Sequence, residues 1–96
     1  MSLQRRIADW LADRLDMTGA EGFVLGLSGG VDSATTAALA VQAVGSESVL
    51  AAILPCHSEP IDAHLAQRVA DVFEIPTVTV NLDDAFDALV EALPPT

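Results

Sequence analysis

The sequence predicts an α/β protein with a Rossmann-like parallel sheet and helices on both faces. Three short runs of apolar or β-branched residues, at 23–27, 49–54 and 77–81, have the composition of buried strands. Segments with the three- and four-residue apolar spacing of helices precede, separate and follow these runs. Short connections between alternating helices and strands favour parallel pairing through right-handed crossovers, so three strands are expected in one sheet.

The first expected element is an amphipathic helix within residues 1–17. Its charged residues fall mostly on one side, and its apolar residues recur at helical spacing: Leu3, Ile7, Trp10, Leu11 and Leu15. Two glycines within 18–22 then interrupt the helical pattern. The continuous apolar run at 23–27 is expected to be a central strand covered on both faces.

Alanine dominates residues 34–44, and small side chains on all sides favour a helix packed closely on a sheet. Gly45 is the expected C-terminal cap of that helix. Pro55 ends the second strand, and Pro60 stands in the first turn of a helix expected at 61–73. The buried stripe of this helix is predicted to contain Ile61, Leu65, Val69, and Val72 or Phe73.

The β-branched run at 77–81 is the third expected strand, and 85–93 is a short last helix. Residues 23–96 are therefore predicted to form a βαβαβα unit. At 96 residues the chain is one domain at most.

Composition excludes several classes of protein. Fourteen acidic residues against four arginines and no lysine give a net charge of −10, so no nucleic-acid partner is expected. A single cysteine excludes an internal disulfide, and the apolar runs are too short for a membrane span or a signal-peptide core. A cytoplasmic protein with no membrane partner is expected.

The segment with the most chemical information is the turn from the first strand into a helix, Gly26-Leu27-Ser28-Gly29-Gly30-Val31-Asp32-Ser33. Glycines at 29 and 30 allow backbone conformations closed to other residues and let a ligand approach the main chain. Unpaired N–H groups at the helix start, the helix dipole and two serine hydroxyls favour a phosphate or pyrophosphate there. The segment is not a Walker A loop, because it has no lysine, and its glycine spacing differs from the dinucleotide fingerprint.

Asp32 distinguishes this loop from a plain anion site. A carboxylate would repel phosphate unless a divalent cation lay between them, so Asp32 is predicted to be a magnesium ligand. The alternative is an ordinary helix start in which Asp32 or Ser33 is the N-cap. That alternative accounts for one or two residues, but not for two serines, two glycines and an acid in one turn.

The run Ser28-Gly29-Gly30-Val31-Asp32-Ser33 resembles the SGGxDS signature of the N-type ATP pyrophosphatases. Together with 7–11, 40–45, Ile53-Leu54-Pro55 and Asp62-Ala63, it is similar to the N-terminal part of an NAD synthetase. The resemblance covers nearly the whole chain. It implies that residues 1–96 are the N-terminal part of an ATP-pyrophosphatase domain, a partial adenine nucleotide alpha hydrolase-like fold.

This resemblance implies a ligase reaction. ATP and Mg²⁺ would adenylate the carboxylate of deamido-NAD, and ammonia would then displace AMP to give NAD, with pyrophosphate released in the first step. Gly26 to Ser33 would hold the ATP phosphates, Asp32 the Mg²⁺, and the backbone near Leu54 the adenine. The family also implies a homodimer. Free ammonia is the simpler nitrogen source, and glutamine-derived ammonia is the alternative.

Family members are longer than this chain, and their later contacts to metal, phosphate and deamido-NAD fall outside it. We therefore assign no catalytic residue, and the 96 residues alone are expected to be inactive. Two alternatives stay open. One is another N-type ATP pyrophosphatase, tRNA-modifying or GMP-synthetase-like, and the other is a nucleotide-binding remnant without catalysis.

Other polar residues have a functional and a structural interpretation. Cys56 and His57 are either a nucleophile pair or loop residues before a helix capped by Ser58 or Glu59. His64 is expected in solvent, and Asp83-Asp84 either reach the site or simply begin a helix. Trp10 is either a core residue or a partner contact.

Overall fold

The computed structural model describes residues 2–94 of the chain; Met1 and residues 95–96 lie outside that range. The elements, in order, are α1 (Leu3–Thr18), β1 (Phe23–Gly26), α2 (Val31–Val44), the 3-10 turn η1 (Ser46–Ser48), β2 (Val49–Ile53), α3 (Pro60–Val72), β3 (Thr77–Thr79) and α4 (Asp83–Ala92). The predicted alternation is confirmed, with η1 in addition. Helix α2 begins three residues earlier than expected, so Val31, Asp32 and Ser33 form its first turn.

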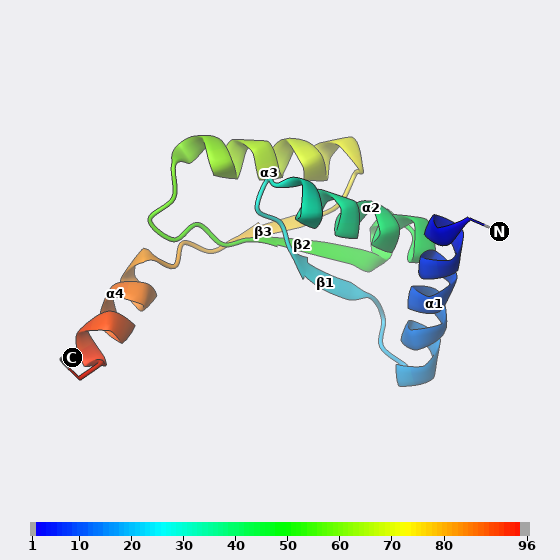
Figure 1. Cartoon of the computed structure of the whole chain (residues 1–96), viewed down its shortest axis with the longest axis horizontal. Coiled ribbons are helices and arrows are strands. Elements are labelled where there is room, and N and C mark those ends of the chain that lie inside the picture. Colours follow the sequence, from blue (N-terminus) through cyan, green and yellow to red (C-terminus); the bar gives the residue numbers. More distant parts are fainter. Residues whose placement is uncertain (1, 95–96) are drawn as a thin grey trace.

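The three strands form a parallel sheet in the order β1-β2-β3. This confirms the Rossmann-like parallel class. Because the strands follow one another in space, right-handed crossovers bring α2 and α3 to the same face of the sheet, as Figure 1 shows. Helices were expected on both faces, but within residues 2–94 the other face is open: Val24, expected in a strand covered on both sides, is 73% exposed.

The core lies between this sheet and its two helices. Alanines at 37 and 40 of α2 and at 66 and 70 of α3 are buried against strand residues such as Val49 and Ala51. The predicted buried stripe of α3 is therefore partly wrong, because Ile61, Leu65 and Val72 are exposed. Small side chains let a helix approach the sheet closely, and the larger ones are left at its flanks.

Helix α1 packs against α2 rather than on the sheet. Ser2 caps it by accepting a hydrogen bond from the Arg5 N–H, and Gly19 ends it in the left-handed conformation. Trp10 is 55% exposed, with the Arg14 guanidinium 5.0 Å from its ring centre. Trp10 is thus a surface residue of the described chain, and its interpretation as a core residue is wrong.

The molecule is extended for its size. Its radius of gyration is 15.9 Å, whereas a compact domain of about 100 residues has one of about 13 Å. Figure 1 shows the reason: α1 and α4 stand at opposite ends of the long axis. None of the described helices is both long and apolar enough to cross a membrane.

Candidate functional site

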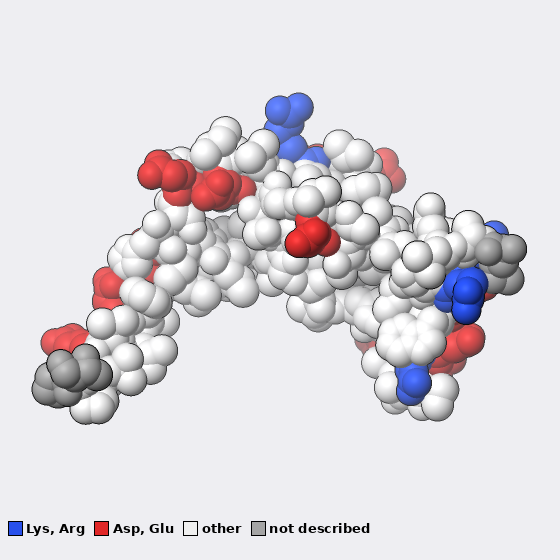
Figure 2. Space-filling view, in the orientation of Figure 1, with Lys and Arg blue, Asp and Glu red and all other residues white. Residues whose placement is uncertain are grey.

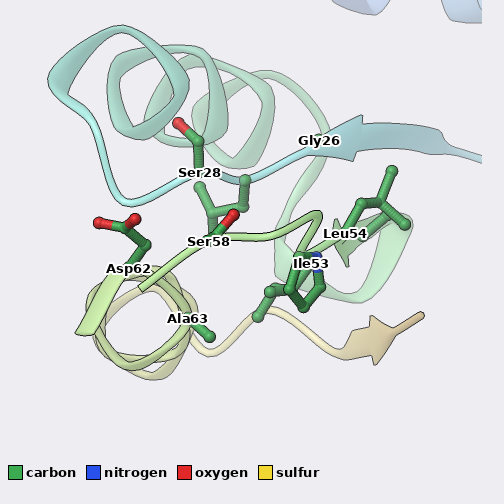
Figure 3. A pocket seen from close by; sticks show the side chains of 10 residues that line it. Gly26, Ser28, Ile53, Leu54, Ser58, Asp62 and Ala63 are labelled. Carbon is green, nitrogen blue, oxygen red and sulfur yellow. The ribbon is translucent and has the colours of Figure 1, made fainter. Parts of the chain in front are cut away.

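The carboxyl ends of β1 and β2 border a cavity of about 450 Å³ (Figure 3). In open parallel sheets this edge is where ligands bind. Helix α3 and the loop before it form the opposite wall. The lining residues are Gly26, Leu27, Ser28, Ala52, Ile53, Leu54, Pro55, Ser58, Asp62 and Ala63.

Two serines fix the shape of the loop beside this cavity. The Ser33 hydroxyl accepts a hydrogen bond from the Ser28 N–H at 3.1 Å and donates one to the Gly30 carbonyl at 3.2 Å. The Ser28 hydroxyl lies 3.1 Å from that of Ser33 and accepts from the Gly30 N–H at 3.3 Å. These hydroxyls, expected to face a ligand, here hold the strand-to-helix turn in one conformation.

The adjacent glycines of the loop differ in what they require. Gly29 has φ +85°, and a Cβ there would lie 3.0 Å from the Leu65 Cβ and 3.1 Å from the Asp62 carbonyl oxygen. Only glycine fits this close approach of the loop to α3. Gly30 has φ −83° and ψ 167°, a backbone open to any residue, so the conformational freedom of glycine is used at Gly29 and not at Gly30.

Position 26 requires glycine neither for a positive φ nor for a close approach of another segment. It lies in β1, and a Cβ there would meet nothing within 4 Å. Since Gly26 lines the cavity, the missing side chain leaves the main chain open to an occupant of the cavity.

The N-terminus of α2 adjoins the loop. Its N-cap is Gly30, with no side-chain capping bond, so neither Asp32 nor Ser33 is the N-cap. The first hydrogen bond of the helix runs from the Ala34 N–H to the Gly30 carbonyl at 3.1 Å. The N–H groups of 31–33 therefore have no partner among the described residues, and they supply the positive end of the helix dipole.

The predicted site residues divide into two groups. Gly26, Leu27, Ser28 and Leu54 line the cavity, whereas Gly29, Gly30, Val31, Asp32 and Ser33 form the adjoining loop and first helical turn. Asp32 is exposed there. Within residues 2–94 no group of three or more His, Cys, Asp and Glu is arranged to hold a metal ion.

Sequence reasoning missed Asp62 and Ser58 as cavity residues. In the sequence Asp62 stands out only as part of a family-like dipeptide at the start of a helix, and that position alone does not show which way the side chain faces. It is the single charged residue of the lining, and no cation is among those residues.

Figure 2 shows acidic side chains spread along the visible face, with arginine side chains near α1 and above α3.

A second polar cluster joins the loop after β2 to α4. The His57 N–H donates to Oδ1 of Asp83, and the His57 Nε2 lies 2.7 Å from Oδ1 of Asp87. The hydrogen bond to Asp87 and the charge of that carboxylate raise the pKa of His57 above its usual 6.5, with a smaller contribution from Asp83. The Phe86 ring packs edge-on against the imidazole, with the ring centres 5.5 Å apart.

This cluster decides between the interpretations of the loop. The His57 imidazole pairs with Asp87 of α4, and the Cys56 thiol donates a long hydrogen bond to the Leu82 carbonyl at 4.0 Å. The nucleophile pair of Cys56 and His57 is therefore wrong for this structure. Glu59 occupies the N-cap position of α3 without a side-chain bond, and His64 is exposed as expected.

Together these features define an α/β protein of the Rossmann-like class, with a glycine-rich strand-to-helix loop beside a cavity at the carboxyl edge of its sheet. A family model described as NAD synthase matches residues 3–96. The chain belongs to the NAD synthase family, which confirms the resemblance read from the sequence.

Individual relatives agree with this assignment. The chain is 39% identical over 88 residues to an NH(3)-dependent NAD(+) synthetase of Carboxydothermus hydrogenoformans, covering 92% of this chain and 36% of the relative. The chain thus spans about a third of the length of the curated relatives it matches.

Solved structures share the fold over nearly the whole chain. An NMN synthetase of Francisella tularensis is 33% identical, with a TM-score of 0.84 over 93% of this chain and 37% of that one. A glutamine-dependent NAD+ synthetase of Acinetobacter baumannii, solved in complex with ADP, is 28% identical, with a TM-score of 0.88 over 94% of this chain and 17% of that one.

Proposed function

We propose that residues 1–96 are the ATP-binding part of an ATP-pyrophosphatase domain that makes NAD from deamido-NAD. The helix within 1–17 and the βαβαβα unit of 23–96 would belong to one domain. The observation that carries the proposal is the unpartnered N–H row of 31–33 beside the cavity at Gly26 to Ser28. No lysine or arginine is among the lining residues, so backbone N–H groups are the donors that would meet phosphate charge at this edge.

The reaction would proceed in two steps, adenylation and then amidation. A carboxylate oxygen of deamido-NAD would attack the α-phosphorus of ATP and release pyrophosphate. Ammonia would then attack the activated carbonyl carbon, expel AMP and lose a proton, leaving the amide of NAD. Adenylation is needed because a carboxylate is a poor electrophile and has no good leaving group.

The loop residues have separate parts in this proposal. The N–H groups of 31–33 would bind the phosphates, and their fixed direction would stabilise charge that develops on the departing pyrophosphate. Leu54 and the main chain at Gly26 would border the adenine end of the cavity. The ADP-bound neighbour supports an adenine nucleotide as the ligand.

Asp32 fits a magnesium ion in one respect. It is an exposed carboxylate in the first turn of α2, beside the unpaired N–H groups. Mg²⁺ in phosphate sites needs only one or two protein carboxylates, because phosphate oxygens and water complete its shell. When bound there, the ion would neutralise phosphate charge that the acidic chain would otherwise repel.

Ammonia is the nitrogen source we favour, because the curated relatives are named NH(3)-dependent. Glutamine-derived ammonia is the alternative, and the glutamine-dependent neighbour shares the same part of the fold. The NMN synthetase neighbour shares it too, so the acceptor substrate would be selected by contacts beyond these residues. A cytoplasmic location without membrane or nucleic-acid partners completes the proposal.

A homodimer is also part of the proposal. The open face of the sheet carries Val24, Leu50 and Val78 exposed at 73%, 36% and 41%, a surface that favours burial in an interface. Sedimentation analysis should give a dimer that Val24→Asp converts to monomer. A wild-type chain that stays monomeric at every concentration tested would contradict this part.

Two measurements on the 96-residue chain test the function. We expect Mg²⁺-dependent ATP binding, measured by chemical-shift changes, that is lost in Asp32→Ala and kept in the control Asp84→Ala. We expect no NAD from deamido-NAD, ATP and either ammonia or glutamine, because the later contacts of the family are missing. Turnover at an ordinary enzymatic rate would refute the inactivity, and absence of ATP binding would refute the assignment of the loop.

A further inference from the structure

Asp62 is the single charged residue lining the cavity, and it is exposed in the first turn of α3. Ala66 and Ala70, at i+4 and i+8 from it, are fully buried. Residues at this spacing share one helix face. The sheet-facing stripe of α3 thus continues past the strand ends into the cavity, where an acid replaces the alanine.

The fold does not use this carboxylate. Among residues 2–94 the Asp62 side chain has no hydrogen bond or ion pair within the protein, and only its backbone N–H is engaged, with the Glu59 carbonyl at 3.0 Å. An acid in the first turn of a helix is favoured by the dipole. That preference explains an acid in the first turn of α3, and the cavity lining places this acid where a bound molecule can meet its carboxylate.

The chemistry of that ligand is restricted. An ionised carboxylate only accepts hydrogen bonds, so the group it meets has to be a donor. A phosphate oxygen is excluded as a direct partner, because two anions repel each other unless a cation lies between them. A pair of sugar hydroxyls supplies two donors, and acidic residues bind ribose hydroxyls in other Rossmann-like folds.

The position in the cavity agrees with a sugar. In Figure 3, Leu54 and Asp62 stand at opposite sides of the cavity, with Ser28 and Ser58 between them. Ser28 begins the proposed phosphate loop, and Leu54 borders the proposed base end. In any nucleoside triphosphate the ribose joins these two parts.

We propose that the carboxylate of Asp62 accepts hydrogen bonds from the ribose hydroxyls of the bound nucleotide and selects ribonucleotides over deoxyribonucleotides. The proposal rests on ATP binding at this cavity. Asp62 would act as a specificity-determining residue, and it takes no part in bond breaking.

The test is a cycle that removes the carboxylate and the hydroxyls in turn. Dissociation constants of ATP, 2′-deoxyATP and 3′-deoxyATP are measured for the wild-type chain and for Asp62→Ala by chemical-shift titration. Wild type should bind ATP roughly tenfold more tightly than at least one deoxy analogue, as expected for a hydrogen bond to a charged group. The affinity of Asp62→Ala for ATP should fall by about the same factor, and this variant should bind ATP and the deoxy analogues equally. Removing the carboxylate and removing the hydroxyl delete the same interaction.

The control is Asp71→Ala, which removes a carboxylate of the same helix away from the cavity. Loss of a negative charge from a chain of net charge −10 should leave anion binding unchanged or slightly tighter. If ATP binding weakens in Asp62→Ala and not in Asp71→Ala, the loss cannot come from the change in net charge, because that change acts in the opposite direction. Asp62→Asn, which keeps the side-chain shape, replaces the alanine variant if the latter fails to fold.

The outcomes separate this proposal from the function it rests on. No ATP binding by the wild-type chain overturns both. ATP binding with an equal loss for ATP and both deoxy analogues in Asp62→Ala, or with no loss, overturns the role of Asp62 alone. A loss that appears only in the presence of Mg²⁺ would make Asp62 a metal ligand and would also overturn it.

Discussion

The imidazole Nε2 of His57 lies 2.7 Å from Oδ1 of Asp87, and this contact ties the loop after β2 to the helix α4. The same loop carries Pro55 and Ser58 of the cavity lining. A backbone bond adds to that contact: the N–H of Leu82, the N-cap residue of α4, donates to the Pro55 carbonyl at 2.7 Å. The position of α4 and the shape of one cavity wall are therefore linked.

Raising the pH should loosen this link. The pKa of His57 is raised above 6.5 in the folded chain, so its pairing with Asp87 contributes stability that is fully present below about pH 6.5. The contribution is lost as the pH rises through the raised pKa. Asp87→Asn should lower the His57 pKa, measured by NMR titration of its ring protons, and should flatten the pH dependence of thermal unfolding.

Asp84→Asn is the matched control, because Asp84 lies in the same first half of α4 and makes no side-chain contact with His57. It should leave the His57 titration nearly unchanged. An equal shift in the two variants would show that the net charge of α4, rather than the contact with Asp87, sets the pKa.

Alanine should have opposite effects at the two loop glycines. Gly29→Ala places a methyl group against Leu65 and the Asp62 carbonyl at φ +85°, and should cost about 1–3 kcal/mol of unfolding free energy. Gly30→Ala meets nothing closer than the Ser28 hydroxyl at 3.5 Å and should be neutral or stabilising by up to about 1 kcal/mol. Urea unfolding of both variants distinguishes them, and equal destabilisation would contradict this geometry.

Gly26→Ala should separate binding from folding. The added methyl group has free space in β1, and alanine is favoured over glycine in a strand by roughly 0.5–1 kcal/mol, so stability should hold or rise. ATP binding should weaken, since the methyl group stands at the cavity lining. Unchanged ATP affinity in a stably folded variant would remove Gly26 from the site.

Ser33→Ala should disorder the loop. It deletes the acceptor of the Ser28 N–H and the donor to the Gly30 carbonyl, so the free energy of unfolding should fall by about 1 kcal/mol. Amide hydrogens of the loop should also exchange faster. Thr35→Ala, which removes only a bond to the Val31 carbonyl within α2, is the control. Exchange rates in the loop that match those of the control would argue against this role.

Local patterns determined much of this protein. Apolar and β-branched runs predicted the three strands, and the segments between them, with apolar residues every three or four positions, predicted helices. Both predictions work because the side-chain periods of strands and helices follow from backbone geometry. The glycine at 45 predicted a helix end that the structure confirms. The SGGVDS run predicted the family, since that spacing is specific and the family match covers residues 3–96.

Tertiary structure decided the rest. Whether Ile61 or Ala66 faces the sheet depends on how closely α3 approaches it, and spacing alone does not fix that distance. The special role of Gly29, but not Gly30, follows from contact with α3, a segment more than thirty residues further along. The place of Asp62 in the cavity and the pairing of His57 with α4 likewise arise only when separate loops meet at one sheet edge.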